Sequence, residues 1–477
     1  MTSTMTLVVD PQRMLDAYLR NDLVAFGEKV FHHLNPGRVF SPGWYIRAMA
    51  YYLQVSAIER QVDRLIINLP PRALKSTMAS VALPAFLLGR DPTLRIVVAS
   101  YSQELANMLG RQTRSVMQSD WYKRLFPSTR LNPRRLAEHD FQTTRGGFRL
   151  ATSTGGTLTG RGGDIIVVDD PLKADDAYSE VRRNSMLEWT RTTLFSRLDD
   201  KRRGVIINVQ QRLHEDDLSG HLLRSGGWLH LNLAAIAERD EHVQLGRGHD
   251  RQYRSAGEAL DPVREPLHVL DQIRRDLGSA IFSAQYQQAP TPADGDVIKM
   301  GWFKRYDVLP AGGQLVMSLD TASKTSEHSS YSAMTVWRVV EGRYYLEYAW
   351  RDRVDYPTLK RRVIGFADIL HPDVLLIEDK VSGTGLIQDL QAEAHGYPVV
   401  AYLPAGDKET RMRLQVARIE AGLVFLPREG AWLADFEEEV RQFPGGKHND
   451  QVDSMSQMLD HMSARRTGQL FIGTYRF

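Results

Sequence analysis

The chain has 477 residues, with 60 Lys and Arg against 58 Asp and Glu, and it contains no cysteine. This length allows two or three domains that each bury a hydrophobic core. The absence of cysteine excludes disulfides, thiolate metal sites and a cysteine nucleophile, so any metal must bind oxygen or imidazole. A net charge of +2 excludes a basic coat over the whole surface, and no apolar stretch is long enough to cross a bilayer. We therefore expect a soluble intracellular protein.

The first 240 residues alternate helical and strand-like segments. Residues from Pro11 to about Val62 carry apolar side chains at helical spacing and predict two or three helices. Short apolar runs bounded by turn residues follow, with helical segments between most of them, at 65–69, 94–99, 148–151, 165–168, 205–209 and 229–233. This alternation is typical of a parallel sheet covered by helices, and it predicts an α/β domain over residues 1–240.

A change of composition separates this domain from a second one. Residues 241–299 are polar and rich in Gly and Pro, which predicts a linker or extended connection. Strand-like runs resume at 314–319, 333–340, 343–350 and 374–377, with a helix near 356–370. We therefore predict a second α/β domain over residues 300–477.

A candidate phosphate-binding loop follows the first predicted strand. Residues 70–77, Pro-Pro-Arg-Ala-Leu-Lys-Ser-Thr, join that strand to a helix. In this geometry backbone N–H groups and a helix N-terminus hold phosphates, while Lys75 reaches the β- and γ-phosphates and Ser76 binds Mg²⁺. The usual glycines are absent, because Leu69 and Leu74 stand in their places. Taken alone, the same residues could form an ordinary strand-to-helix turn.

Two adjacent carboxylates, Asp169 and Asp170, end another predicted strand. A nucleotide-bound Mg²⁺ and an attacking water need such groups at the carboxyl end of a neighbouring parallel strand. We predict that Asp169 supports the metal and that Asp170 orients or deprotonates the water, although Asp-Asp-Pro is also common in turns and helix caps. The next predicted strand ends at Gln210 and Gln211, either of which could sense the γ-phosphate. The predicted nucleotide and Mg²⁺ site thus comprises Pro71, Arg72, Ala73, Leu74, Lys75, Ser76, Thr77, Asp169, Asp170 and Gln211.

A second group of acids lies in the C-terminal block. Asp320 and Glu378 each end an apolar strand, and Asp450 and Asp453 lie on one face of a predicted final helix. Such carboxylates suit two Mg²⁺ or Mn²⁺ ions that activate water for phosphodiester hydrolysis. Either Asp450 or Asp453 could be the third ligand. Each acid alone could be a solvated side chain, but the order strand, strand, late helix favours a metal nuclease of ribonuclease H type.

The types of these motifs and their order along the chain resemble those of the large terminase subunits of tailed bacteriophages and prophages. The similar segments are 69–76, 157–163, 169–171, 211–218, 282–288 and 450–453, with Asp320 and Glu378. The resemblance implies an N-terminal P-loop ATPase of the additional-strand, catalytic-glutamate type and a C-terminal ribonuclease H-like nuclease. It also implies that Asp170 takes a place often held by Glu, that Arg72 could stabilise charge in cis, and that Arg161 could act on a neighbouring subunit.

The resemblance further implies an activity and its partners. ATP hydrolysis would drive double-stranded viral DNA into a procapsid, and a Mg²⁺- or Mn²⁺-dependent endonuclease would cut the concatemer. The implied partners are the portal protein, the small terminase subunit and other copies of the chain in a pentameric ring, with no membrane, in the cytoplasm of the infected bacterial host.

Two alternatives stay open at this point. One is a helicase-like ATPase-nuclease of DNA repair or restriction, although no second helicase core is recognisable between the two sites. The other is a non-catalytic DNA-binding assembly protein with degenerate sites, for which Leu74 and Asn449 are the relevant departures from the family pattern.

Overall fold

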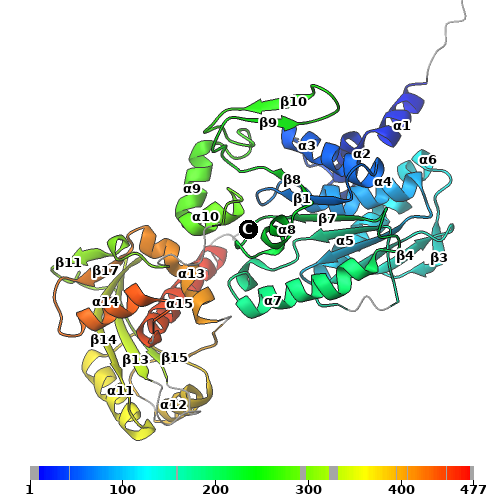
Figure 1. Ribbon diagram of the computed structural model, residues 1–477. Helices are drawn as coiled ribbons and strands as arrows, with labels where there is room; N and C mark the ends of the chain where they lie inside the picture. Colours follow the sequence, from blue (N-terminus) through cyan, green and yellow to red (C-terminus); the bar gives the residue numbers. More distant parts are fainter. Residues whose placement is uncertain are drawn as a thin grey trace, which may run out of the picture. The chain divides into compact units, whose positions relative to one another are not determined.

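The computed structural model describes residues 10–41, 43–156, 160–290, 297–321, 331–393, 395–404, 407–446 and 448–472. Thr157, Leu158 and Thr159, which belong to one of the similar segments, lie outside these ranges. The chain divides into an N-terminal unit of residues 1–272 and 280–291 and a C-terminal unit of residues 273–279 and 292–477 (Figure 1). None of the described helices has the length and apolar character needed to span a membrane.

An eight-stranded sheet forms the centre of the N-terminal unit, with strand order β3-β4-β5-β2-β6-β7-β1-β8 in the described ranges. The strands are β1 (Arg64–Asn68), β2 (Arg95–Ser100), β3 (Leu131–Leu136), β4 (Asp140–Thr143), β5 (Phe148–Ser153), β6 (Ile165–Asp169), β7 (Val205–Gln210) and β8 (Leu229–Asn232). The strands from β5 to β8 in this order are parallel, and β3 and β4 add an antiparallel edge. Because β7 lies between β1 and β6, the segments that follow all three strands meet at one edge of the sheet.

Helices cover both faces of this sheet. Successive side chains of a strand point to opposite faces. Leu65 and Ile67 accordingly pack into one hydrophobic cluster with α2 to α6, whereas Ile66 packs into another with α7 and α8. The helices are α1 (Pro11–Asn21), α2 (Leu23–Leu34), α3 (Trp44–Leu53), α4 (Leu83–Arg90), α5 (Gln103–Gln118), α6 (Asp120–Leu125), α7 (Glu180–Trp189) and α8 (Leu218–Ser225). Burial on both faces explains why these strands are continuous apolar runs.

Residues 241–299, for which an extended connection was predicted, contain regular structure. The elements are a hairpin of β9 (Glu241–Gln244) and β10 (Arg251–Arg254) and the helices α9 (Leu267–Leu277) and α10 (Ser279–Gln285). The polar composition reflects how little of these elements is buried, since they contribute only isolated core side chains such as Val243, Leu270 and Phe282. Residues 241–272 and 280–290 belong to the N-terminal unit.

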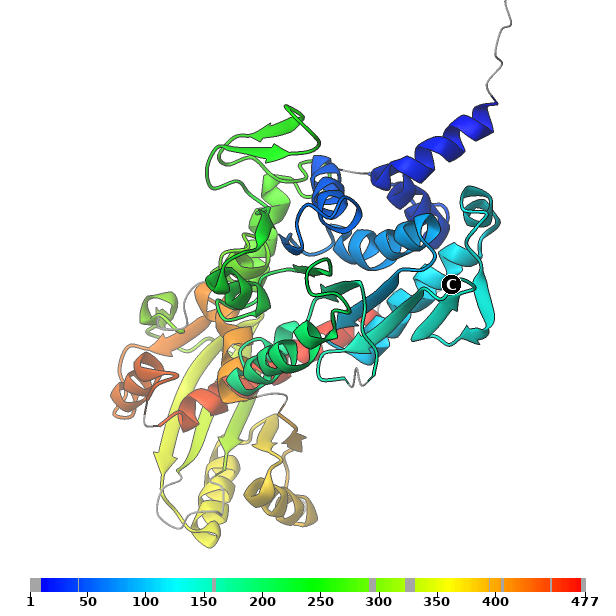
Figure 2. The same cartoon turned by 45° about the vertical axis from the view of Figure 1, so that its right-hand side comes forward.

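A mixed sheet forms the centre of the C-terminal unit (Figure 2). Among the described residues it has seven strands in the order β11-β17-β14-β13-β12-β15-β16. The strands are β11 (Lys304–Tyr306), β12 (Gln314–Asp320), β13 (Ser332–Val340), β14 (Arg343–Asp352), β15 (Val374–Glu378), β16 (Val399–Tyr402) and β17 (Val424–Pro427). β12, β13 and β14 are antiparallel neighbours, while β15 and β16 continue from β12 in parallel.

Two layers of helices enclose this second sheet. The helices are α11 (Tyr356–Leu370), α12 (Val381–Ala392), α13 (Lys408–Glu420), α14 (Leu433–Gln442) and α15 (Asp450–Ile472). Val316 and Leu376 pack with α13, α14 and α15, whereas Met317 and Leu375 pack with α11 and α12. The predicted α/β class is therefore confirmed for both units.

Candidate nucleotide and metal sites

The loop after β1 turns through two residues with left-handed backbone. Arg72 has a φ of 62° and Leu74 a φ of 57°. A residue with a side chain loses roughly 1 kcal/mol or more in this conformation, which is why glycine is usual there. Thr77 then begins a π-helical segment that continues into α4. The loop keeps a glycine-type path although it contains no glycine.

Lys75 folds back onto this loop. Its Nζ donates to the carbonyl oxygens of Leu69 (3.0 Å) and Pro70 (2.8 Å), and the side chain is buried. Burial lowers the pKa of Lys75, and the nearby charges of Asp170 and Asp169 oppose this effect. An ammonium group beside a loop and a helix start offers positive charge to a phosphate.

Asp169 faces the loop from the end of β6. Its Oδ1 accepts a hydrogen bond from Ser76 Oγ (3.1 Å) and its Oδ2 accepts one from Ser80 Oγ (2.6 Å). Burial raises the pKa of Asp169, and the neighbouring charge of Asp170 raises it further. A hydroxyl paired with a strand-end carboxylate is the arrangement by which P-loop enzymes hold Mg²⁺. Ser80 was missed in the sequence, although it lies four residues after Ser76.

Asp170 lies at the same edge, one residue beyond β6. Its φ is 44°, and its backbone N–H donates to the carbonyl of Val209 (2.9 Å). Its Oδ1 accepts a hydrogen bond from the backbone N–H of Gln211 (3.3 Å). Burial raises the pKa of Asp170, and the charge of Lys75 opposes this. The structure thus brings the carboxylate of Asp170 and the backbone of Gln211 together with Lys75.

The two arginines with predicted catalytic roles lie in different surroundings. Arg72 is exposed in the loop itself. Arg161 makes two hydrogen bonds to Asp140 (2.9 and 3.1 Å), and its guanidinium lies 4.2 Å from the ring centroid of Phe148. Asp140 is on β4, which β5, β2, β6 and β7 separate from β1. Arg161 is therefore not at the loop of its own chain, and a role on a neighbouring subunit stays a prediction.

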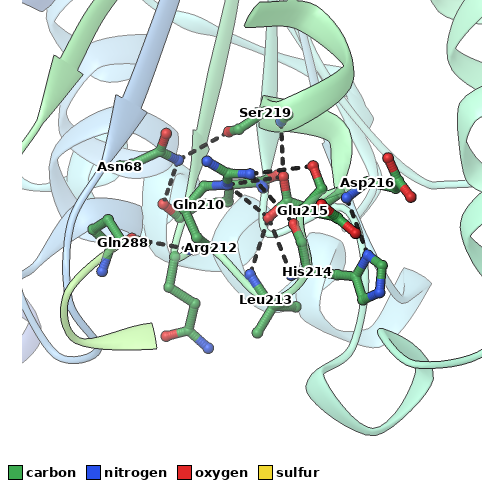
Figure 3. A network of polar contacts seen from close by, with 12 residues as sticks. Asn68, Gln210, Arg212, Leu213, His214, Glu215, Asp216, Ser219 and Gln288 are labelled. Atoms are coloured by element: carbon green, nitrogen blue, oxygen red, sulfur yellow. Dashed lines mark hydrogen bonds and ion pairs between the residues drawn. The ribbon is translucent and has the colours of Figure 1, made fainter. Parts of the chain in front are cut away.

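A buried polar network fixes the end of β7 (Figure 3). Arg212 Nε donates to both carboxylate oxygens of Asp217, at 2.9 Å each, and Asp217 also caps α8 by accepting from Gly220 N–H (2.9 Å). The backbone N–H of Arg212 donates to Gln288 Oε1 (2.9 Å), which ties the residue after Gln211 to the chain that follows α10.

A second part of the network lies between β1, β7 and β8. Asn68 Nδ2 donates to the Gln210 carbonyl (3.1 Å) and to Ser219 Oγ (2.9 Å), while Asn68 Oδ1 lies 2.8 Å from His230 Nε2. Because the Asn68 amide uses its donors elsewhere, its oxygen accepts from His230, which assigns the proton to Nε2. These bonds hold the three strand ends in register.

The acids of the C-terminal unit also converge. Leu319 and Ile377 are register partners in β12 and β15, so Asp320 and Glu378 follow side by side; burial raises the pKa of Asp320, and the charge of Glu378 raises it further. The first turn of α15 reaches them because Ser454 bonds to both β12 and β13: its carbonyl accepts from Ser318 Oγ (2.7 Å) and its Oγ accepts from Thr335 N–H (3.1 Å).

Two cations from α13 lie among these acids. Lys408 Nζ is 3.2 Å from Asp320 Oδ2 and 3.9 Å from Asp450 Oδ1, and it also contacts Asp453. Arg411 Nη2 is 3.0 Å from Asp453 Oδ1 and 3.5 Å from Glu378 Oε1. Sequence reasoning missed both, and their spacing of three residues on a helix was the available signal.

The carboxylate oxygens of these acids are the type of ligand that a hard divalent cation prefers. Burial raises the pKa of Asp320, Asp450 and Asp453, so these carboxylates need positive charge to stay ionised. In the described part of the chain, no three carboxylates or imidazoles form a metal-binding group. Lys408 and Arg411 supply the positive charge to these acids instead.

Comparisons with known proteins agree with this architecture. Residues 317–462 match the family model described as the terminase RNaseH-like domain. The structure resembles the large terminase of a thermophilic bacteriophage in complex with ADP, at 12% identity, 88% coverage of this chain, 99% of that chain and a TM-score of 0.53. The corresponding values for the large terminase of the same phage in complex with ATP-gamma-S are 12%, 88%, 99% and 0.51. No curated protein matches the sequence.

These matches confirm two predictions. The resemblance to large terminases holds across both units, because the similar fold covers most of each chain. The α/β fold of both units is similar to that of a large terminase, and the C-terminal unit contains the match to the terminase RNaseH-like domain.

Proposed function

We propose that the protein is the large terminase subunit of a tailed bacteriophage or prophage, which drives double-stranded DNA into a procapsid with ATP and cuts it. The ATPase would occupy residues 1–240 and the nuclease residues 300–477. The observation that carries the proposal is the combination in one chain of a phosphate-loop edge and a buried carboxylate cluster, in the fold of a large terminase.

The ATPase half of the proposal assigns a role to each group at the sheet edge. Lys75 and the backbone of residues 71–77 would hold the phosphates, and Ser76 and Asp169 would hold Mg²⁺, which neutralises phosphate charge when bound. Asp170 would orient the attacking water and accept its proton, because the Gln211 N–H fixes one oxygen of this carboxylate. Arg72 could offset transition-state charge in cis, and Arg161 could do so on a neighbouring subunit.

The nuclease half assigns metal binding to Asp320, Glu378 and either Asp450 or Asp453. Divalent ions bound there would supply an activated water and stabilise the leaving oxygen of the DNA backbone. Lys408 must leave its contacts with these acids for ions to enter. Arg411 can remain near Glu378 and keep it ionised.

The partners are proposed from the family resemblance. They are double-stranded DNA, the portal protein, the small terminase subunit and other copies of the chain in a pentameric ring, in the cytoplasm of the infected bacterium. The described residues of the N-terminal unit contain one P-loop sheet, which does not favour a helicase with two such cores.

A pair of activity assays on the purified protein tests the two sites separately. We expect Mg²⁺-dependent ATP hydrolysis that Lys75→Ala abolishes, and plasmid cleavage with Mg²⁺ or Mn²⁺ that Asp320→Ala abolishes. Each variant should retain the other activity. Failure of the wild-type protein in both assays would overturn the proposal. Translocation is tested with purified procapsids, where packaged duplex becomes protected from added nuclease.

A further inference from the structure

A side chain from the connection between the two predicted domains holds the phosphate loop. Arg264 Nη1 donates to the carbonyl oxygen of Arg72 (2.8 Å), although the two residues are 192 positions apart. Arg72 is one of the two left-handed residues of the loop. The bond therefore acts on a peptide group whose orientation the local sequence does not favour.

Arg264 is itself fixed by buried partners. Asp261 Oδ1 accepts from the backbone N–H of Arg264 (3.1 Å), and Asp261 Oδ2 accepts from the hydroxyl of Tyr45 (3.0 Å). The same hydroxyl lies 3.4 Å from Arg264 Nη1, and Glu265 Oε2 lies 3.4 Å from Nη2. Tyr45 and Asp261 are 1% and 6% exposed. The guanidinium is thus held by protein groups.

We propose that Arg264 is a positioning residue of the nucleotide site, which keeps the glycine-free loop in its phosphate-binding conformation through the carbonyl of Arg72. This inference rests on the proposed ATPase function. In loops of this kind glycine normally permits the left-handed turn. In this chain side chains stand at those positions, and the hydrogen bond from Arg264 compensates by restraining the peptide from outside.

The first test compares Arg264→Ala and Arg264→Lys with a matched control. Arg251→Ala is the control, because Arg251 lies in the same connection and its side chain bonds to Gln244, away from the loop. We expect Arg264→Ala to bind fluorescent ADP with Mg²⁺ about tenfold more weakly, since it loses one charge-assisted hydrogen bond. Amide exchange in residues 71–77 of the nucleotide-free protein should accelerate. Arg264→Lys should recover part of both effects, because its amine can also donate to a carbonyl.

The second test distinguishes positioning from general stabilisation. Arg72→Gly removes the conformational strain at position 72, since glycine adopts left-handed backbone readily. In the Arg72→Gly background, Arg264→Ala should therefore weaken ADP binding by less than about threefold. The comparison uses only the ratio of the ADP affinities of two proteins that both carry Arg72→Gly. The loss of the Arg72 side chain is common to both and does not affect this ratio.

The outcomes separate this proposal from the function on which it rests. Equal losses on Arg264→Ala in both backgrounds, or wild-type ADP binding and loop exchange in Arg264→Ala, would overturn the positioning role alone. A wild-type protein that binds no ADP would overturn the ATPase function together with it. If Arg264→Ala fails to fold, Arg264→Lys in the wild-type and Arg72→Gly backgrounds gives the same comparison with smaller differences.

Discussion

Lys408 is the side chain whose removal tests the acidic site of the C-terminal unit most directly. Its Nζ contacts Asp320, Asp450 and Asp453 from the start of α13. Lys408→Met keeps the length of the side chain and removes its charge. We expect the metal-free protein to lose stability and to gain a stronger response to divalent cations.

The expected loss follows from the distances and the burial. At 3.2 Å and an effective dielectric constant of about 20, one ion pair has a gross attraction of about 5 kcal/mol, most of which desolvation offsets. Removing one partner of a buried ion pair costs about 3 to 5 kcal/mol. Because 41% of the Lys408 side chain is exposed and Arg411 remains, we take the lower end, about 3 kcal/mol.

Native-state hydrogen exchange in strands β12 and β15 measures this loss without interference from the N-terminal unit. Lys360→Met is the matched control, because Lys360 also bridges two carboxylates, Asp389 and Glu393, but these are 44% and 43% exposed, whereas Asp320 is 7% exposed. The control should lose much less stability, because solvent screens its ion pairs. Mn²⁺ should restore the Lys408 variant in particular, since the ion no longer competes with an ammonium group. Equal losses in the two variants, or no added response to Mn²⁺, would refute the reasoning.

Three further changes test the N-terminal unit. Burial lowers the pKa of His230 to about 4, so only the unfolded chain binds this proton between pH 4 and 6.5. Folding stability should fall by about 2 kcal/mol from pH 8 to pH 5 through this group; His230→Gln should remove that part of the pH dependence in denaturant unfolding. Arg212→Met leaves Asp217 buried without its cation and should cost about 3 to 4 kcal/mol, measured as a lower unfolding temperature. Ser80→Ala removes a hydrogen bond to Asp169 and should raise the Mg²⁺ concentration for half-maximal ATP hydrolysis about tenfold.

Buried parallel strands were predictable from the sequence, whereas the half-exposed antiparallel edge strand β3 was not. The apolar run at 65–69 became β1 (Arg64–Asn68), and the run at 205–209 became β7 (Val205–Gln210). These strands are buried on both faces, so hydrophobicity alone marks them. β3 (Leu131–Leu136) contains Pro133 and is half exposed, and its sequence has no apolar pattern that indicates a strand. Its place depends on pairing with β4, a contact that local sequence does not encode.

The residues of the candidate sites also fall into those that the sequence predicted and those that it did not. Asp169, Asp170, Asp320 and Glu378 could be found because each follows an apolar strand, and parallel strands bring their carboxyl ends together. The sequence did not predict Ser80, Lys408 and Arg411, which contact these acids, or Arg264, which contacts the loop. These residues lie on other elements, and only tertiary packing brings them to the acids or the loop.

Residues 241–299 contact the proposed nucleotide-binding edge of the N-terminal sheet at two places. Arg264 bonds to the carbonyl of Arg72 after β1, and Gln288 bonds to the N–H of Arg212 after β7. Since β1 and β7 are adjacent parallel strands, both contacts lie on the edge where we propose that nucleotide binds. Helix α9 lies between these contacts in the chain, and its residues divide between the two units. The two contacts therefore flank, in the sequence, the helix in which the chain passes from one unit to the other.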